Sequence, residues 1–338
     1  MLTIAQSIAP LVLIIIVGVV SGHTGLLSPM FCKALSDFCF YFGMPALLVR
    51  TIAASPPSLT AAHLIWGAYL LPAGLVWIAA TIAARDEDAR NEASSIAMAS
   101  TYGNVIMLGI PLALAQFGQA SATTVAFIVL VHSPVLFLVA ALHSELVEGL
   151  RVSRLQEADA VSLPVGGVAI PRGRMIGACL VRAMCEVCIE LTTNPIIIAI
   201  VAGLVLRMTG VGLDPITSTA LSLVGQATLP CVLLAMGLGL SAFEFKGKAG
   251  VIGVISFLKL AAMPMMAWLV SSHLFHLASR EVAVITLLSA MPTGANAYVF
   301  ASRYGKAEAS VSGAIALSTI LSIVTVTMVL ATVGARLE

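Results

Sequence analysis

The sequence predicts an all-α integral membrane protein with ten transmembrane helices, arranged as two inverted five-helix repeats. Of its 338 residues, 59% are hydrophobic and only 10% are charged, whereas a soluble domain carries roughly 25% charged residues. Long apolar segments recur along the chain, and a pattern from the first half returns in the second. The 17 Lys and Arg nearly balance the 16 Asp and Glu, which argues against nucleic acid as a partner.

Ten segments are long enough to cross a bilayer. A spanning helix needs about 20 mostly apolar residues, because each residue rises about 1.5 Å through a hydrocarbon layer roughly 30 Å thick. The predicted segments are 4–22, 29–51, 61–83, 93–116, 121–143, 176–206, 214–241, 250–274, 280–302 and 308–333. The first segment is not expected to be a cleaved signal peptide, because no Lys or Arg precedes it.

The basic residues predict how these segments are oriented. If the N-terminus is outside, thirteen of the 17 fall in inside loops or helix ends: Lys33, Arg85, Arg90, Arg151, Arg154, Arg172, Arg174, Arg182, Lys246, Lys248, Lys259, Arg303 and Lys306. Only Arg50, Arg207, Arg280 and Arg336 fall outside. Because basic residues favour the cytoplasmic side, we expect a multi-pass protein of the plasma (inner) membrane with both termini outside.

A repeat relates the two halves at an offset of 185 residues. The matched pairs include Pro10/Pro195, Gly18/Gly203 and Gly25/Gly210. Since each copy contains five spans, an odd number, the second copy must enter the membrane from the opposite side. Inverted repeats of this kind are typical of secondary transporters, whose site lies near the midplane. The predicted units are a first repeat over 1–147, a cytoplasmic linker over 148–174 and a second repeat over 175–338.

The fourth and ninth segments each carry a polar cluster that should break the helix. Discontinuous helices expose backbone N–H and C=O groups inside the membrane, and in such folds they build the substrate site. The predicted substrate-binding residues are Asn104, Gly109, Ile110, Pro111, Pro292, Thr293, Gly294 and Asn296. At the offset of 185, Asn104 meets Ser289, Gly109 meets Gly294 and Pro111 meets Asn296. Kinks that bind nothing are the alternative explanation for either cluster alone.

Several motifs, in order, resemble the auxin efflux carrier family, which includes PIN-type plant carriers and bacterial malonate and malate permeases. They are 25–29, 42–48, 104–111, 229–240 and 292–301. The resemblance covers nearly the whole chain and implies that helices four and nine cross at their breaks, with Asn104 and Pro111 at the crossover. It also implies an elevator-like movement of one domain against another. Asn296 stands where PIN-type carriers have proline, and the short central loop is similar to that of the bacterial members.

The expected function is secondary transport of a small organic anion, most simply a dicarboxylate such as malonate or malate, by alternating access. The N-termini of half-helices carry partial positive charge and free N–H donors, which suit carboxylates. No Arg or Lys is expected mid-span near either break, so binding would rest on backbone dipoles and Asn amides. A channel-like uniporter of organic anions is the nearest alternative. An intramembrane enzyme is more remote, because no catalytic constellation occurs at convincing spacing.

Asp37 and His132 are candidate residues for coupling to a proton or sodium ion, because acids and histidines inside the membrane often mark ion paths. The alternatives are an i,i+4 pair of Asp37 with Lys33 and a packing role for His132. Cys185 and Cys188 have CxxC spacing without a second pair or a histidine cluster, so neither a metal nor a cofactor is expected. Membrane lipid is an expected partner, and a second copy in a homodimer is a candidate one.

Overall fold

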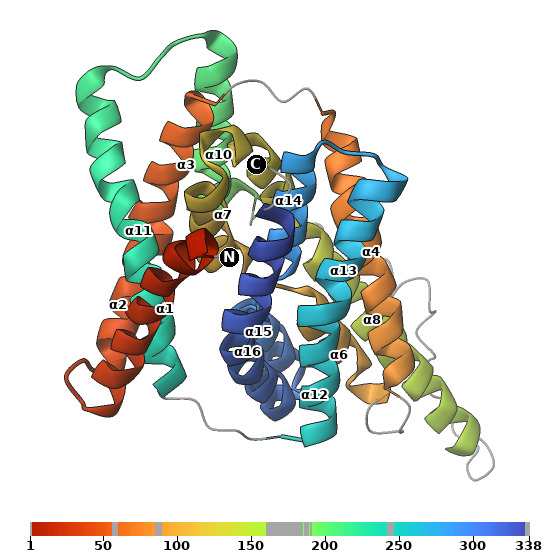
Figure 1. Cartoon of the computed structure of the whole chain (residues 1–338). Helices are drawn as coiled ribbons and strands as arrows, with labels where there is room; N and C mark the ends of the chain where they lie inside the picture. Colours follow the sequence, from red (N-terminus) through yellow and green to blue (C-terminus); the bar gives the residue numbers. More distant parts are fainter. Residues whose placement is uncertain are drawn as a thin grey trace.

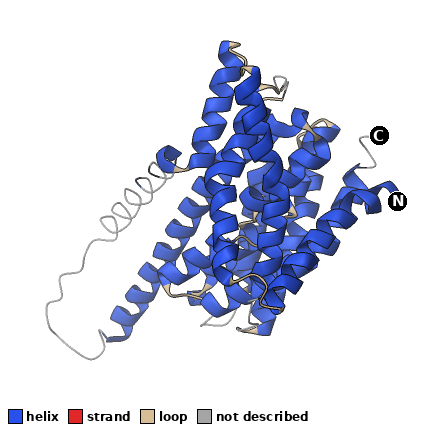
Figure 2. Ribbon diagram, turned by 90° about the vertical axis from the view of Figure 1, so that its left-hand side faces the viewer, coloured by secondary structure: helices blue, strands red, loops and turns tan. Residues whose placement is uncertain are grey.

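The chain forms a bundle of tilted helices in a computed structural model (Figures 1 and 2). The structure describes residues 2–55, 60–84, 90–159, 185, 189, 191–241 and 247–334. Within these residues there are helices and loops but no strand, and a single isolated β-bridge. Six helical runs are long and apolar enough to cross a membrane. The prediction of an all-helical membrane protein is therefore confirmed.

The helices of the first half follow most of the predicted segments. They are α1 (Leu2–His23), α2 (Pro29–Phe38), α3 (Met44–Ala53), α4 (Ala62–Ala83), α6 (Ala93–Thr101), α7 (Ile110–Phe117) and α8 (Ala122–Asp159). Helix α8 continues through residues 148–159, where the sequence predicts the beginning of a linker. These residues are rich in Leu, Glu and Arg, which have high helix propensity. The rest of the predicted linker, 160–174, lies outside the described residues.

The second half contains a comparable series of helices. They are α10 (Pro195–Thr209), α11 (Pro215–Ser241), α12 (Ala249–Phe257), α13 (Met263–Leu269), α14 (Ser279–Ser289), α15 (Ala295–Tyr304) and α16 (Glu308–Gly334). Helix α10 begins within the predicted span 176–206, because Pro195 has no N–H and Asn194 caps the new helix by accepting from Ile196 N–H at 2.9 Å. Apart from 185 and 189, the residues of 176–190 lie outside the described part of the chain.

Three prolines in the middle of long segments follow a π-helical turn. Proline lacks an N–H, and its ring crowds the carbonyl four residues earlier; a wider turn relieves this crowding. The three turns and their prolines are Cys39–Gly43 with Pro45, Val105–Gly109 with Pro111, and Leu258–Ala262 with Pro264. The helical path therefore continues through Pro111, and the break in the fourth segment lies earlier than the proline suggests.

The described helices pack as two bundles, each of which takes helices from both halves of the chain. The flanking bundle contains α1, α2, α3, α10 and α11. The crossing bundle contains α4, α6, α7, α8 and α12 to α16. Figure 1 shows α1, α2, α3 and α11 on the left, with α4, α12 and α13 on the right. Contacts between the two bundles are sparse compared with those within each of them.

Helices α1 and α11 approach so closely that only glycine fits between them. A Cβ added to Gly18 would lie 2.5 Å from the Leu234 carbonyl oxygen, and one added to Gly237 would lie 2.1 Å from the Ile15 carbonyl oxygen. Small residues at such contacts are typical of helix pairs in membranes, where backbones pack directly on each other. The glycines therefore fix the spacing of the flanking bundle.

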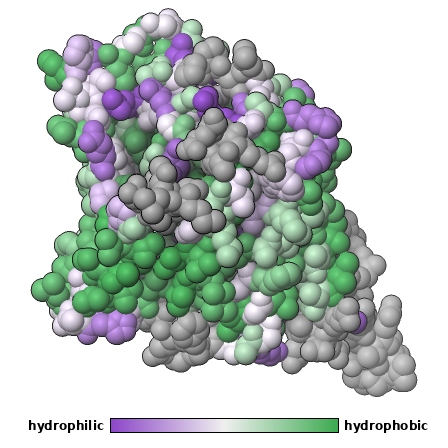
Figure 3. Space-filling model, viewed as in Figure 1, coloured by the Kyte–Doolittle hydropathy of each residue, from purple (hydrophilic) through white to green (hydrophobic). Residues whose placement is uncertain are grey.

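Large apolar side chains cover much of the outer surface. Exposed fractions reach 56% for Val17 on α1, 83% for Ile216 on α11 and 66% for Phe257 on α12. Figure 3 shows the corresponding broad hydrophobic areas on one face of the molecule. Soluble monomers rarely expose apolar patches of this extent, so this surface is suited to lipid.

Candidate functional site

The breaks in the fourth and ninth segments lie against each other. Asn104 N–H donates to the Pro292 carbonyl at 2.7 Å, and Gly294 N–H donates to the Tyr102 carbonyl at 3.0 Å. These bonds form an antiparallel bridge between Gly103 and Thr293. Unpaired backbone groups are costly inside a membrane, so each break satisfies part of the other. The two breaks therefore form one crossing.

The repeat offset does not predict which residues meet there. Gly103 and Thr293 lie 190 positions apart rather than 185. Helix α14 has 11 residues where α6 has 9, and the break after α14 is also longer. The matches of Gly109 with Gly294 and of Pro111 with Asn296 align the two halves of the sequence and are not contacts at the crossing, so they stay predictions.

The Thr293 residue ties the second break to two helices. Its hydroxyl donates to the Ala99 carbonyl at 3.0 Å, near the end of α6. Its N–H donates to the Ser318 hydroxyl of α16 at 3.1 Å. Because Thr293 is buried, its polar groups are used to hold the crossing together.

The Tyr102 hydroxyl connects the second break to α8 through two further hydrogen bonds. The Asn296 amide donates to the Tyr102 oxygen at 2.9 Å, and the Tyr102 hydroxyl shares a hydrogen bond of 2.7 Å with the Ser133 hydroxyl of α8. Tyr102 and Ser133 are buried, whereas Asn296 is exposed. Asn296 is therefore the exposed end of a series of hydrogen-bonded side chains that continues through Tyr102 to Ser133 inside the bundle.

The imidazole of His132 is fully buried beside the first break. One ring nitrogen, Nε2, lies 3.1 Å from the Gly103 carbonyl, and the other, Nδ1, lies 2.8 Å from the Tyr69 hydroxyl. A carbonyl only accepts, so we assign the proton to Nε2 and let Nδ1 accept from Tyr69. Both nitrogens of a neutral imidazole are then satisfied, and His132 holds the break in place. Its coupling role stays a prediction.

Replacing Tyr69 by Phe is expected to lower the free energy of unfolding by about 1–3 kcal/mol, because a buried acceptor on His132 then loses its donor. The midpoint of thermal unfolding in detergent measures this. The matched control is Tyr41→Phe, which removes a hydroxyl from a side chain that is 58% exposed. Equal shifts for the two variants would contradict the proposed bond.

The Lys259 amine lies at the crossing, although the sequence predicts a helix end for this residue. The Lys259 side chain is 0% exposed, and its Nζ donates to the Ser289 carbonyl, the last of α14, at 2.7 Å. A Cβ added to Gly103 would lie 3.2 Å from the same Nζ. The expectations that Lys259 lies at an inside helix end and that no Lys falls mid-span near a break are therefore wrong. The π-helical turn that carries Lys259 directs it inward.

Among the other predicted residues, Gly109, Ile110 and Pro111 are buried beyond the crossing. A Cβ on Gly109 would lie 2.8 Å from a methyl carbon of Leu288, so this position serves the packing of the fourth segment on α14. The Asn104 residue is half-buried at the crossing itself. Asn104 and Asn296 thus offer the accessible polar side chains of the predicted set.

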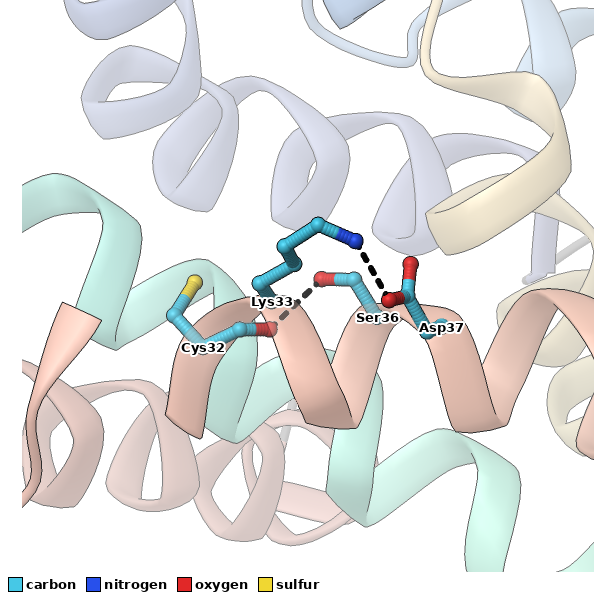
Figure 4. A network of polar contacts seen from close by, with 4 residues as sticks. All are labelled: Cys32, Lys33, Ser36 and Asp37. Carbon is cyan, nitrogen blue, oxygen red and sulfur yellow. Dashed lines mark hydrogen bonds and ion pairs between the residues drawn. The ribbon is translucent and has the colours of Figure 1, made fainter. Parts of the chain in front are cut away.

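The Asp37 carboxylate lies on α2 in the flanking bundle, paired with Lys33. The Lys33 Nζ is 2.6 Å from Asp37 Oδ2, and the two side chains are 76% and 49% exposed. Figure 4 shows this pair beside the bond from the Ser36 hydroxyl to the Cys32 carbonyl. The i,i+4 alternative is thus present in the structure, and coupling through Asp37 stays a prediction.

A cavity of about 500 Å³ lies between α13, α14 and α16. Apolar side chains such as Leu260, Met265 and Trp268 form most of its lining, together with Thr286 and Thr325. None of the predicted substrate-binding residues lines this cavity, so it is distinct from the predicted substrate site at the crossing.

Comparison with known proteins agrees with this architecture. The sequence model of a family described as "Membrane transport protein" matches residues 3–330. A protein of Rhizobium meliloti (strain 1021) named "Putative malonate transporter" is 26% identical over 297 residues, which cover 87% of this chain and 84% of that protein. These matches indicate a transporter and not an enzyme. The chain belongs to the membrane transport protein family, the auxin efflux carrier family that its motifs indicate.

Proposed function

We propose that this protein is a secondary transporter of a small organic anion, with a dicarboxylate such as malonate as the leading substrate. The observation that carries the proposal is the crossing of two broken helices, with Asn104 and Asn296 accessible beside it. The name of the Rhizobium meliloti relative supports the substrate class.

The crossing has the chemistry that a carboxylate needs. A helical run begins after Asn104 and another after Gly294, and the first amides of each run have no partner within their own helix. Such ends carry roughly half a positive charge. Two Asn amides and the nearby Lys259 ammonium add donors. The site residues Pro292, Thr293 and Gly294 would set the geometry, while Gly109, Ile110 and Pro111 would support it.

Packing in the flanking bundle supports an inverted repeat. In an arrangement with a two-fold axis, a residue contacts its own repeat mate only on the axis. Gly43 and Thr228 differ by the repeat offset, and a Cβ on Gly43 would lie 2.5 Å from the Thr228 hydroxyl oxygen.

A second pair of contacts follows the same rule. Gly18 packs on Gly237, and at the repeat offset this pair maps onto Gly203 and Ile52. A Cβ on Gly203 would lie 2.9 Å from the Ile52 Cβ. Both observations favour ten spans in two halves related by a two-fold axis. The distribution of Lys and Arg favours the plasma membrane with both termini outside.

The two bundles support an elevator-like alternating-access cycle. A gap of about 50 Å³ remains between them, lined mainly by apolar side chains such as Val12, Leu112, Leu233 and Leu330. Apolar side chains lose few directional bonds when one surface slides along another. We infer that the crossing bundle moves with the substrate while the flanking bundle stays fixed.

Replacing Asn104 by Ala is expected to lower kcat/KM for malonate roughly 10- to 150-fold, which corresponds to losing a hydrogen bond to a charged group worth about 1.5–3 kcal/mol. Uptake and counterflow of labelled malonate in proteoliposomes would measure this. Asn91→Ala, which removes an amide before the start of α6, is the matched control. Unchanged transport in Asn104→Ala would refute the central residue of the proposed site.

The same preparation separates a transporter from a channel. Counterflow, in which unlabelled malonate inside accelerates entry of the label, is expected for a carrier with alternating access. An ohmic current that does not saturate with malonate would instead favour the channel-like uniporter.

A further inference from the structure

The Lys259 side chain lies inside the crossing bundle, on the π-helical turn Leu258–Ala262. It is among the largest fully buried side chains of the protein. Its Nζ contacts the end of α14 through the Ser289 carbonyl and lies next to Gly103 in the other break. The amine therefore bonds to one interrupted segment and lies beside the other, where the proposed substrate binds.

The charge of this ammonium is only partly balanced. Within the described part of the chain, the ion pair is Lys33–Asp37, and no carboxylate lies within ion-pair distance of Lys259. The carbonyl end of α14 offers about half a negative charge. Removing an ammonium from water costs several kcal/mol unless its charge is well compensated. A protonated Lys259 would thus be a cation to which the described residues around it offer about half a counter-charge.

An anion at the crossing would supply the missing negative charge. By linkage, if a protonated Lys259 strengthens anion binding, the bound anion strengthens proton binding by the same factor. The anion and the proton then occupy the site together and leave it together.

We propose that Lys259 is the proton-binding residue of the transport cycle, so that the protein is an anion–proton symporter. On the entry side the amine takes a proton from water and binds the anion as an ammonium; on the exit side both are released, and the neutral amine returns. One proton moves with each anion. This inference rests on the proposed function and assigns coupling to a residue other than Asp37 and His132.

Other titratable groups on the elements around Lys259 must be separated from it. Helices α6, α12 and α13 carry none. The groups on or beside the remaining elements are His63 and Tyr69 on α4, Tyr102 in the break, Arg280 and Glu281 in the first turn of α14, and Glu308 in the first turn of α16. Helix α8 carries His132 and, further along, His143, Glu145, Glu148, Arg151, Arg154, Glu157 and Asp159. Of these, His132 bonds to Gly103 and is the main competitor.

The test uses the full-length protein in proteoliposomes, with malonate at pH values where it keeps both charges. Lys259→Arg keeps a cation that does not release its proton. We expect this variant to retain counterflow. Its accumulation of malonate driven by a proton gradient should fall at least about tenfold below that of the wild type. Lys259→Met has no cation, and we expect its KM to rise at least about tenfold and to become independent of pH.

The control variants are Lys33→Met and His132→Gln. Lys33→Met removes an exposed ammonium of the flanking bundle and should change neither assay. His132→Gln should keep the ratio of gradient-driven accumulation to counterflow. If the ratio of gradient-driven accumulation to counterflow falls in His132→Gln and stays at the wild-type value in Lys259→Arg, the proton binds His132 and the inference is overturned.

The remaining outcomes also decide. Gradient-driven accumulation at the wild-type level in Lys259→Arg overturns the inference, as does a KM with unchanged pH dependence in Lys259→Met. If neither variant folds, a pH-sensitive dye inside the vesicles measures whether protons enter with malonate in the wild type. If no proton enters with malonate, the inference is overturned. If the wild type shows malonate counterflow without any proton effect, only this inference fails. If it transports no organic acid, the proposed function fails as well.

Discussion

Replacing Gly294 by Val is expected to reduce transport about 5- to 150-fold while the protein still inserts and folds. Even a Cβ at this position would lie 3.0 Å from the Gly103 carbonyl oxygen and 3.0 Å from Tyr102 Cδ1, and Val adds two methyl groups. Overpacking of this kind costs about 1–3 kcal/mol, which is the range of the expected rate change. The strain falls on the bond from Gly294 N–H to the Tyr102 carbonyl.

Initial rates of malonate counterflow, normalised to protein that elutes as a single species in gel filtration, measure the effect. Gly253→Val is the matched control, because nothing lies within 4 Å of a Cβ at Gly253 on α12. If both variants transport at the same rate, the geometry of the bridge is not important for transport.

Replacing Gly237 by Ala is expected to destabilise the protein by about 1–3 kcal/mol, although Ala usually favours a helix over Gly by about 1 kcal/mol. The added Cβ would lie 2.1 Å from the Ile15 carbonyl oxygen. Backbone atoms cannot rotate away as a side chain does, so α1 and α11 must separate.

Thermal unfolding of the detergent-solubilised protein measures this change. The control is Gly239→Ala on the same helix, where a Cβ meets nothing within 4 Å, so its midpoint should stay the same or rise. The two substitutions are chemically identical, and only the neighbour differs. A fall of equal size in both would show that the α1–α11 contact is not the cause.

Composition and segment length predict the helical membrane fold well, because an apolar solvent imposes its own length and polarity on every spanning helix. The repeat likewise points to the glycines that pack in the flanking bundle, such as Gly18 and Gly203. The clusters around Asn104 and Asn296 correctly locate the two interrupted segments. Whether all ten segments span the membrane stays a prediction.

The finer geometry of the crossing depends on features that the sequence does not display. An extra residue in a helix or a break moves the contact from one pair to another, as for Gly103 and Thr293. Pro111 suggests a break in the helix, whereas the helix continues through Pro111 because a π-helical turn precedes it. The position of Lys259, nine residues into an apolar segment, is the signal that a mid-span charge was present. Tyr69 and Tyr102 lack even such a signal, because aromatic residues in membrane helices are common.

The bridge between Tyr102–Asn104 and Pro292–Gly294 also has a consequence for biosynthesis. Its partners are 188 and 192 positions apart in the chain. At about 5–20 residues per second, the ribosome needs roughly 10–40 s after making the first partner to make the second. During this delay the Asn104 amide and the Tyr102 carbonyl must be sheltered from lipid, by water, by the insertion machinery or by a temporary helical path. We therefore expect the nascent N-terminal half to stay associated with the translocon until the final spans emerge.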